Sequence, residues 1–195
     1  DVLPAFWNLN MTMPSMLLLF IPFAVLAWAV AVYNRLVRLR NQVRTAWADI
    51  DVQLVRRHDL VPQLVSAVGA YAVHERAVLE AVTELRARAV AETDRPRLAS
   101  VEAELEQAIG RLLVLKEAYP DLKASENFQQ LQRDLVDVED HLQYARRFYN
   151  GAVREHNDAI QRFPDLLLAR PFGFSAEDFF EAGDAQRAAL RVELP

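Results

Sequence analysis

The sequence contains no cysteine and only five glycines among 195 residues, and both shortages limit the kinds of functional site that it can form. Without cysteine there are no disulfides, thiolate zinc sites, Cys-ligated iron–sulfur clusters or cysteine nucleophiles. Glycine-rich phosphate loops and a G-x-S-x-G nucleophile elbow are also absent. The net charge of -5 argues against a general nucleic-acid binder. Few glycines with 52% hydrophobic residues favour helices over strands and tight turns.

The histidines do not follow a ligand pattern, and residues 1–57 contain none. Metal-binding helical bundles use Glu-x-x-His, but no Glu precedes any of the four histidines by three residues. A single histidine on an apolar stripe, such as His156, is interpreted as a hydrogen-bonded core residue. We therefore expect no catalytic residue, no cofactor and no metal.

The first segment is predicted to be a membrane anchor. No charged residue occurs from Val2 to Asn34, and Met16–Tyr33 is almost unbroken apolar sequence. Residues 14–33 match the roughly 20 residues that a transmembrane helix needs, with a kink expected at Pro22. The alternatives are a cleaved signal peptide and a buried core helix. The apolar run is longer than a signal peptide's core, and the helical pattern continues past it.

A basic collar follows the apolar run at once. Its members are Arg35, Arg38, Arg40 and Arg44. Residues 34–57 carry a net charge of +4, whereas residues 58–195 carry -8. The positive-inside rule then places the C-terminal part in the cytoplasm. The collar arginines are predicted to contact anionic lipid headgroups.

Beyond the collar, apolar residues recur every three or four positions, which is typical of amphipathic helices. The longest stripe contains Phe128, Leu131, Leu135, Val138, Leu142, Ala145, Tyr149, Ala152, His156, Ala159 or Ile160, and Phe163. It predicts a helix over 125–163, about 58 Å long at ~1.5 Å per residue. Ser125 is its expected N-cap and Pro164 its stop.

Three shorter patterns surround this helix. One follows the anchor, with Leu36, Leu39, Val43, Trp47, Ile50 and Leu54. Another comes after Pro62, with Leu64, Val68, Tyr71, Val78, Val82, Leu85 and Ala89, and the sequence leaves open whether Pro62 breaks the helix. The last contains Leu98, Val101, Leu105, Ile109, Leu112 and Leu115 after a turn at 93–96.

These patterns predict an all-α protein, in which an N-terminal transmembrane helix precedes an antiparallel four-helix bundle. The expected segments are 1–13, the anchor 14–33, the bundle 34–181 and a tail 182–195. The apolar stretch from Asp165 is predicted to cap the end of the bundle. Ser175–Asp178 resembles a helix start. Gly110 lies inside a predicted helix, where it costs up to ~1 kcal/mol unless a neighbour packs closely there.

Two groups of residues are candidates for partner contact. Ala24, Ala27 and Ala31 place small side chains at helical spacing, which lets membrane helices approach closely. The alternative is that these alanines simply tolerate lipid. Arg56 and Arg57, beside His58 and Asp59, form the densest polar cluster. This cluster is interpreted either as a charged helix face or as a patch that docks a partner.

Several motifs together resemble the LemA family over residues 33–181. They are Tyr33–Val43, Ala46–Leu54, Arg56–Val65, Tyr71–Glu75, Glu126–Gln132, Ala145–Asn150, Val153, Asn157, Phe163–Pro164, Gly173–Phe174 and Phe179–Glu181. The resemblance implies a bacterial membrane-anchored helical bundle whose relatives include a magnetosome protein. It implies no established enzymatic activity. Some family members are encoded near membrane metalloproteases, which hints at partners of that kind.

The resulting functional hypothesis is a non-enzymatic, membrane-anchored bundle that acts as an interaction or accessory subunit of a membrane protein complex. Its expected partners are membrane lipid and other membrane proteins, with no nucleic acid, and homo-oligomers stay open. One alternative is an envelope or membrane-remodelling factor that acts through self-assembly. Another is a regulator of a membrane protease.

Overall fold

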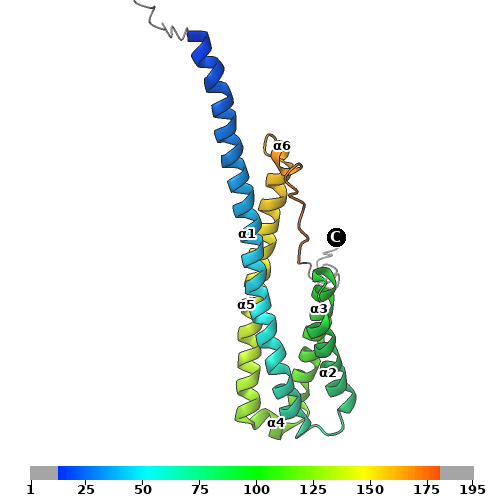
Figure 1. The fold of residues 1–195 in the computed structure, drawn as a ribbon. Coiled ribbons are helices and arrows are strands. Elements are labelled where there is room, and N and C mark those ends of the chain that lie inside the picture. Colours follow the sequence, from blue (N-terminus) through cyan, green and yellow to red (C-terminus); the bar gives the residue numbers. More distant parts are fainter. Residues whose placement is uncertain (1–12, 181–195) are drawn as a thin grey trace, which may run out of the picture.

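The computed structural model describes residues 13–180, with side chains from residue 20 onward, and every regular element among them is a helix. The long helices are α1 (Met13–Gly69), α2 (Arg76–Ala91), α3 (Arg95–Val114) and α5 (Glu126–Gln161). The short ones are η1 (Leu115–Glu117), α4 (Pro120–Ala124) and α6 (Leu166–Ala169). The long helices alternate in direction, and α1 extends far beyond the others (Figure 1). This confirms the predicted all-α bundle. The expected segment 182–195, like residues 1–12, lies outside the described residues.

Helix α1 continues through Pro62, which answers the question that the sequence left open. Proline lacks the N–H that would bond the carbonyl of His58, four residues earlier. In the fold, Arg86 of α2 donates from Nε to that carbonyl at 2.6 Å. A neighbouring helix therefore supplies the missing donor, and the chain does not need to break.

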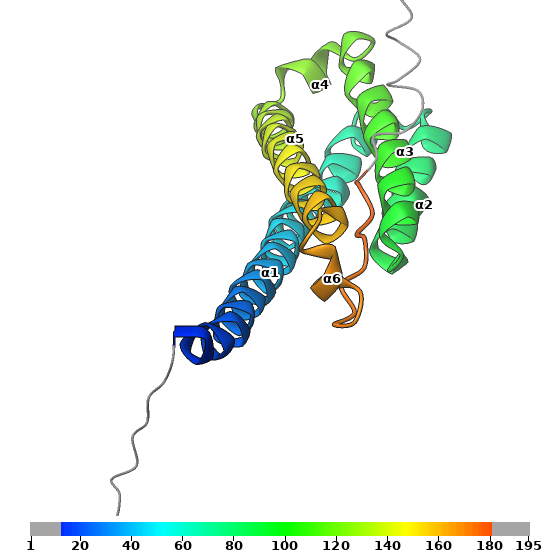
Figure 2. The same ribbon diagram turned by 90° about the horizontal axis from the view of Figure 1, so that it is seen from above.

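Helix α5 begins and ends close to where its sequence predicts. The Ser125 hydroxyl accepts a hydrogen bond from the Phe128 N–H, so Ser125 is the N-cap. The last helical residue is Gln161, just before Pro164. Its predicted stripe is buried up to Ile160, whereas Phe163 is exposed. The stripe packs along α1, and the contact between α1 and α5 is the most extensive helix pair of the bundle. Figure 2 shows this pair from above.

The core consists of three apolar clusters along the bundle. The cluster farthest from the anchor gathers residues of α1, α2, α3, α4 and α5 around Leu64, Leu105 and Phe128. A middle cluster surrounds Ile50 and Leu142, and a third joins α1 to α6 around Leu36 and Phe174. The end nearest the anchor thus lies beyond α2 and α3, with α6 beside α1 and α5 (Figure 1).

Two local expectations were wrong. The stripe after Pro62 is shared between two helices, because α1 ends at Gly69 and α2 begins only at Arg76; Tyr71 is exposed in the turn between them. Ser175–Asp178 does not start a helix. It is extended instead, because side chains of α5 bond its backbone, as described below. The expected end-cap is present, since α6 and Phe174 close the bundle.

Candidate functional site

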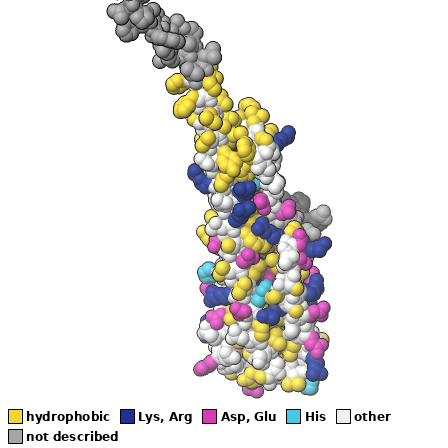
Figure 3. Space-filling view, in the orientation of Figure 1, with side chains coloured by type: hydrophobic (Ala, Val, Ile, Leu, Met, Phe, Trp, Pro, Cys, Tyr) yellow, Lys and Arg dark blue, Asp and Glu magenta, His cyan; other side chains and the backbone are white. Residues whose placement is uncertain are grey.

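The apolar part of α1 stands clear of the bundle. Its exposed large side chains are Phe20, Ile21, Phe23, Val25, Leu26 and Val30. Among the described residues, α1 is the one helix long and apolar enough to cross a membrane, and only 11% of its apolar window is buried. A core helix of a soluble protein is mostly buried, so this exposure fits a single-pass membrane protein. Figure 3 shows the apolar surface at this end of the molecule.

The four collar arginines divide into two pairs. Arg35 bonds Asp165 at 3.1 Å, and Arg40 stacks over the Phe174 ring at 4.9 Å from its centroid. These two arginines tie α1 to the segment around α6. Arg38 and Arg44 are exposed and make no ion pair with the described residues. Arg38 and Arg44 are therefore the collar arginines that are free to make the predicted contact with lipid headgroups.

The candidate partner contacts differ in accessibility. Ala24, Ala27 and Ala31 are all exposed on α1, and Arg56 is exposed while bonding Asp137 at 2.9 Å. Their contact with a partner stays a prediction. Arg57 is different, because only 2% of its surface is exposed. It lies in the core of the bundle, so little of its side chain is open to a partner.

Arg57 is the centre of a buried ionic network that joins three helices. Its guanidinium bonds Glu102 of α3 at 3.1 Å and also bonds Glu139 of α5. His58 Nε2 lies 2.6 Å from the other oxygen of Glu102. A carboxylate only accepts, so this imidazole nitrogen donates. Three charged side chains and an imidazole contact one another here, which supports the helix-face interpretation of the Arg56–Asp59 cluster.

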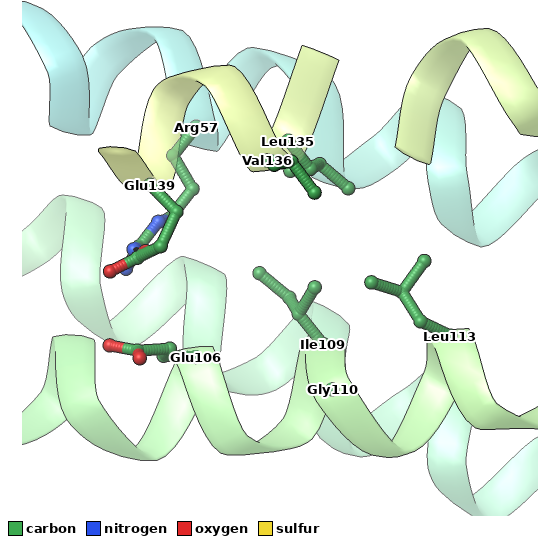
Figure 4. Close-up of a pocket in the computed structure, with 8 residues that line it drawn as sticks. All are labelled: Arg57, Glu106, Ile109, Gly110, Leu113, Leu135, Val136 and Glu139. Carbon is green, nitrogen blue, oxygen red and sulfur yellow. Dashed lines mark hydrogen bonds and ion pairs between the residues drawn. The ribbon is translucent and has the colours of Figure 1, made fainter. Parts of the chain in front are cut away.

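A shallow apolar groove lies beside this network, between α3 and α5. Ile109, Gly110 and Leu113 of α3 face Leu135 and Val136 of α5 across it (Figure 4). Arg57, Glu106 and Glu139 form its polar end (Figure 4). Its volume is about 160 Å³, which is well below the roughly 300–1,000 Å³ of typical ligand pockets. The groove has room for a single apolar side chain.

The segment 175–180, here called the strap, lies along α5 in extended form. Asn157 exchanges two hydrogen bonds with the backbone of Glu177, each at 2.9 Å. Asn150 does the same with Phe180, at 3.0 and 2.9 Å. The two amide side chains thus hold the strap in the way a neighbouring β-strand would.

The strap completes an aromatic cluster in the middle of the bundle. Trp47 packs edge-on against Tyr149 at 5.3 Å between ring centroids and lies 5.9 Å from Phe180. Arg95 stacks over the Trp47 indole at 4.4 Å. Tyr149 donates its hydroxyl to the Asp178 carbonyl at 2.8 Å. Burial raises the pKa of Tyr149, although nearby Arg95 opposes the shift. The phenol is thus a structural donor.

Sequence reasoning missed Asn150, Asn157 and Glu102 as structural residues. The asparagines have a seven-residue spacing that places both on one face of α5. They lie beside the apolar stripe, and this spacing was the available signal. Glu102 sits between Val101 and Leu105 of a predicted apolar stripe, and only the fold pairs it with Arg57.

The histidines fall into three environments. His58 belongs to the ionic network. His156 is fully buried, with its Nδ1 3.3 Å from the Asn157 side-chain oxygen and its Nε2 without a hydrogen-bond partner among the described residues. His74 and His141 are exposed. Within residues that the structure describes, no group of three or more histidine, aspartate or glutamate side chains has the arrangement to hold a metal ion.

Comparison with known proteins assigns the chain to a family. A model described as the LemA family matches residues 46–194, which is most of the chain. The chain belongs to the LemA family. The matched region contains all residues of the buried ionic network and begins at Ala46, within the apolar stripe of α1 that follows the anchor. As a member of the LemA family, the protein shares its helical, membrane-associated character.

Curated relatives are similar over most of this chain. Magnetosome protein MamQ of Magnetospirillum gryphiswaldense is 24% identical over 181 aligned residues, covering 78% of this chain and 66% of the relative. Magnetosome protein MamQ 2 of Paramagnetospirillum magneticum has the same identity and coverage. Protein LemA of Metamycoplasma hominis is 24% identical over 155 residues, covering 79% and 71%. The chain therefore spans 66% of the length of the MamQ relatives.

Proposed function

We propose that this protein is an interaction or accessory subunit of a membrane protein complex, anchored by residues 14–33. The observation that carries the proposal is the continuity of α1. One unbroken helix contains both the exposed apolar segment and, from Val32 to Val68, a buried stripe of the bundle core. Any partner that fixes the anchor in the bilayer therefore also fixes the position and orientation of the bundle.

The proposed role is non-enzymatic. The buried charged groups that a catalytic site would direct at a substrate are here directed at one another. Glu102 receives both Arg57 and His58, and none of the three is more than 8% exposed. Such a network fixes the packing of three helices. It therefore supports a bundle that presents a rigid surface to partners.

We place the anchor in the bacterial inner membrane with the bundle in the cytoplasm. Arg38 and Arg44 support this orientation, because they are exposed directly after the apolar segment and are unpaired among the described residues. Protease added outside intact spheroplasts should leave residues 45–195 uncut. Digestion of the bundle in intact spheroplasts would show the reverse orientation.

Mild detergent extraction, native size analysis and mass spectrometry test the proposed function directly. We expect a defined set of membrane proteins at fixed stoichiometry with this chain. Arg56→Ala should weaken that association if Arg56 contacts a partner. Arg76→Ala is the matched control, because Arg76 is also an exposed arginine in an ion pair but begins α2, on another helix of the bundle. Recovery of the protein alone, as a monomer, would contradict the proposal.

The second candidate is a membrane-remodelling or envelope factor that acts by self-assembly. Similarity to proteins named magnetosome protein MamQ is the observation that favours it. Large homo-oligomers in the same extraction would support this candidate over the accessory-subunit role. Recovery of a membrane metalloprotease as the stoichiometric partner would instead support a role as protease regulator.

A further inference from the structure

The end of the bundle nearest the anchor exposes large apolar side chains that the bundle does not use. Phe163, Leu167 and Phe172 are 75%, 59% and 57% exposed. We call the segment 162–174 the tip; it contains α6 and the turns on either side. A soluble surface seldom gathers such side chains without a partner, so the tip needs an explanation beyond packing.

The tip is fixed beside the lower end of the membrane anchor. Tyr33 packs edge-on against Phe172 at 5.2 Å and against Phe174 at 5.9 Å between ring centroids. Higher up α1, Val32 is buried in the cluster around α6, and Trp28 packs against the same cluster. The tip therefore overlaps α1 from Trp28 to Tyr33, and these residues belong to the apolar segment that precedes the collar (Figure 1).

This overlap sets the depth of the tip. The apolar sequence of the anchor ends at Tyr33, and the first charge follows at Arg35. The rise from Trp28 to Tyr33 is about 7–8 Å at ~1.5 Å per residue. Interfacial segments bury their apolar faces roughly 5–10 Å into the headgroup and acyl boundary. If residues 14–33 span the bilayer, the tip is held at that depth.

The charges of the tip also suit a lipid surface. Arg162 and Arg170 are exposed at its edges, where their long side chains can reach the headgroups. The only acidic residue from Ala159 to Ser175 is Asp165. Asp165 is 5% exposed and bonds Arg35, so its charge is neutralised within the fold. Exposed side chains of the tip are therefore apolar or basic, as anionic membranes require.

We propose that the tip inserts into the membrane interface as a second lipid contact beside the transmembrane anchor. This inference rests on the anchor that the proposed function assumes. The occupant of the apolar surface is lipid, because the surface is continuous with α1 and lies at the depth of the interface. Two contacts, one spanning and one interfacial, prevent the bundle from swivelling freely about α1. Together the two contacts hold the bundle at a fixed tilt to the membrane.

Because the sequence contains no cysteine, a single introduced cysteine can be labelled specifically, and the depth of the tip in the membrane can be measured directly. Phe163→Cys and Leu167→Cys are made separately in the full chain, labelled with an environment-sensitive fluorophore and reconstituted into vesicles of zwitterionic and anionic phospholipid. Quenching by aqueous iodide is compared with quenching by lipid-borne nitroxide. Tyr144→Cys is the aqueous control, because Tyr144 is 67% exposed in the middle of α5. Phe23→Cys, on the exposed part of the anchor, is the bilayer control.

We expect several-fold weaker iodide quenching at positions 163 and 167 than at 144, together with strong quenching by the lipid-borne nitroxide. Iodide quenching equal to that at position 144 would overturn the proposal. Protection from both quenchers would also overturn it, since the tip would then be covered by a second copy of this chain. The label at position 23 separates the two claims. If it is in lipid while the tip is in water, the anchor stands and only the interfacial tip fails.

Discussion

The two parts of α1 have the same backbone but opposite surroundings. Before Trp28, apolar side chains such as Phe23 and Leu26 are exposed around the whole helix. From Val32 onward, one face of the helix carries a buried apolar stripe, with Leu36 and Ile50 at 0% exposed. An all-round apolar helix needs lipid, whereas a striped one needs other helices. The change from lipid-facing to helix-facing surroundings therefore occurs within one continuous helix, where the tip packs against α1.

The largest expected effect is in the bundle, at its buried charges. Glu102→Ala leaves Arg57 and His58 facing each other without the carboxylate that both contact. We expect a loss of about 3–5 kcal/mol in the free energy of unfolding, as is usual when one partner of a buried ion pair is removed. Denaturant unfolding of the full chain in detergent measures it. Glu102→Gln keeps the volume and an acceptor and should cost less. Equal stability of Glu102→Ala and wild type would contradict the network's role.

Matched leucine truncations, one in α5 of the bundle and one in the exposed part of α1, compare the bundle with the anchor most plainly. Leu142 is fully buried in the middle cluster, whereas Leu26 is 62% exposed on the anchor. Leu142→Ala should cost about 2–5 kcal/mol of unfolding free energy because it leaves a cavity. Leu26→Ala should leave bundle unfolding unchanged. The melting temperature of the full chain in detergent checks both. An unchanged value for Leu142→Ala would place that stripe at a partner interface.

A smaller effect is expected where α1 passes Pro62. Arg86→Ala removes the donor that satisfies the His58 carbonyl. Hydrogen bonds to charged groups contribute about 1.5–3 kcal/mol, and we expect a loss of that order. Hydrogen exchange of amides around residues 58–66 should accelerate, showing local opening of α1. Arg88→Ala is the control, because within residues 13–180 the one ion pair of Arg88 is an exposed contact with Glu104. Equal exchange in the two variants would mean that Arg86 is not what keeps the helix continuous.

The smallest effect distinguishes two glycines. A Cβ at Gly110 would meet nothing within 4 Å, so no close packing offsets the cost of glycine within α3. Gly110→Ala should therefore stabilise the bundle by about 0.5–1 kcal/mol. Gly173 has φ +70° in the tip, where a side chain is strained. Gly173→Ala should destabilise by about 1–2 kcal/mol. Thermal unfolding of both variants checks the signs, and stabilisation by Gly173→Ala would be the contrary result.

Periodic apolar residues were enough to predict most of the helices. The cap at Ser125, the stripe of α5 and the apolar start of α1 depend on neighbours in sequence, so local patterns reveal them. The passage through Pro62 depends on Arg86, the charge of Arg57 is satisfied by Glu102 and Glu139, and the strap is extended because Asn150 and Asn157 bond its backbone. These features need partners far away in the sequence, which a local pattern cannot supply.

The structure shows which residues of the anchor can be exchanged without disturbing the bundle. The sequence separates anchor from bundle at residues 33 and 34, but Trp28 and Val32 already pack against the cluster around α6. An exchange of the whole of residues 14–33 would therefore damage the bundle together with the anchor. Replacing only residues 14–27 preserves the packed part of α1, and it removes Ala24 and Ala27 while keeping Ala31.

The central claim is that anchor and bundle engage membrane partners together. It is tested most directly by replacing residues 14–27 with polyleucine, keeping 28–195, and measuring the stoichiometry of copurified membrane proteins. An unchanged melting temperature of the exchanged protein would show that its bundle is intact. We expect partner recovery to fall well below that of the wild-type chain. Recovery of every partner at wild-type stoichiometry would contradict it, since the anchor would then be only a tether and the binding would lie in the bundle.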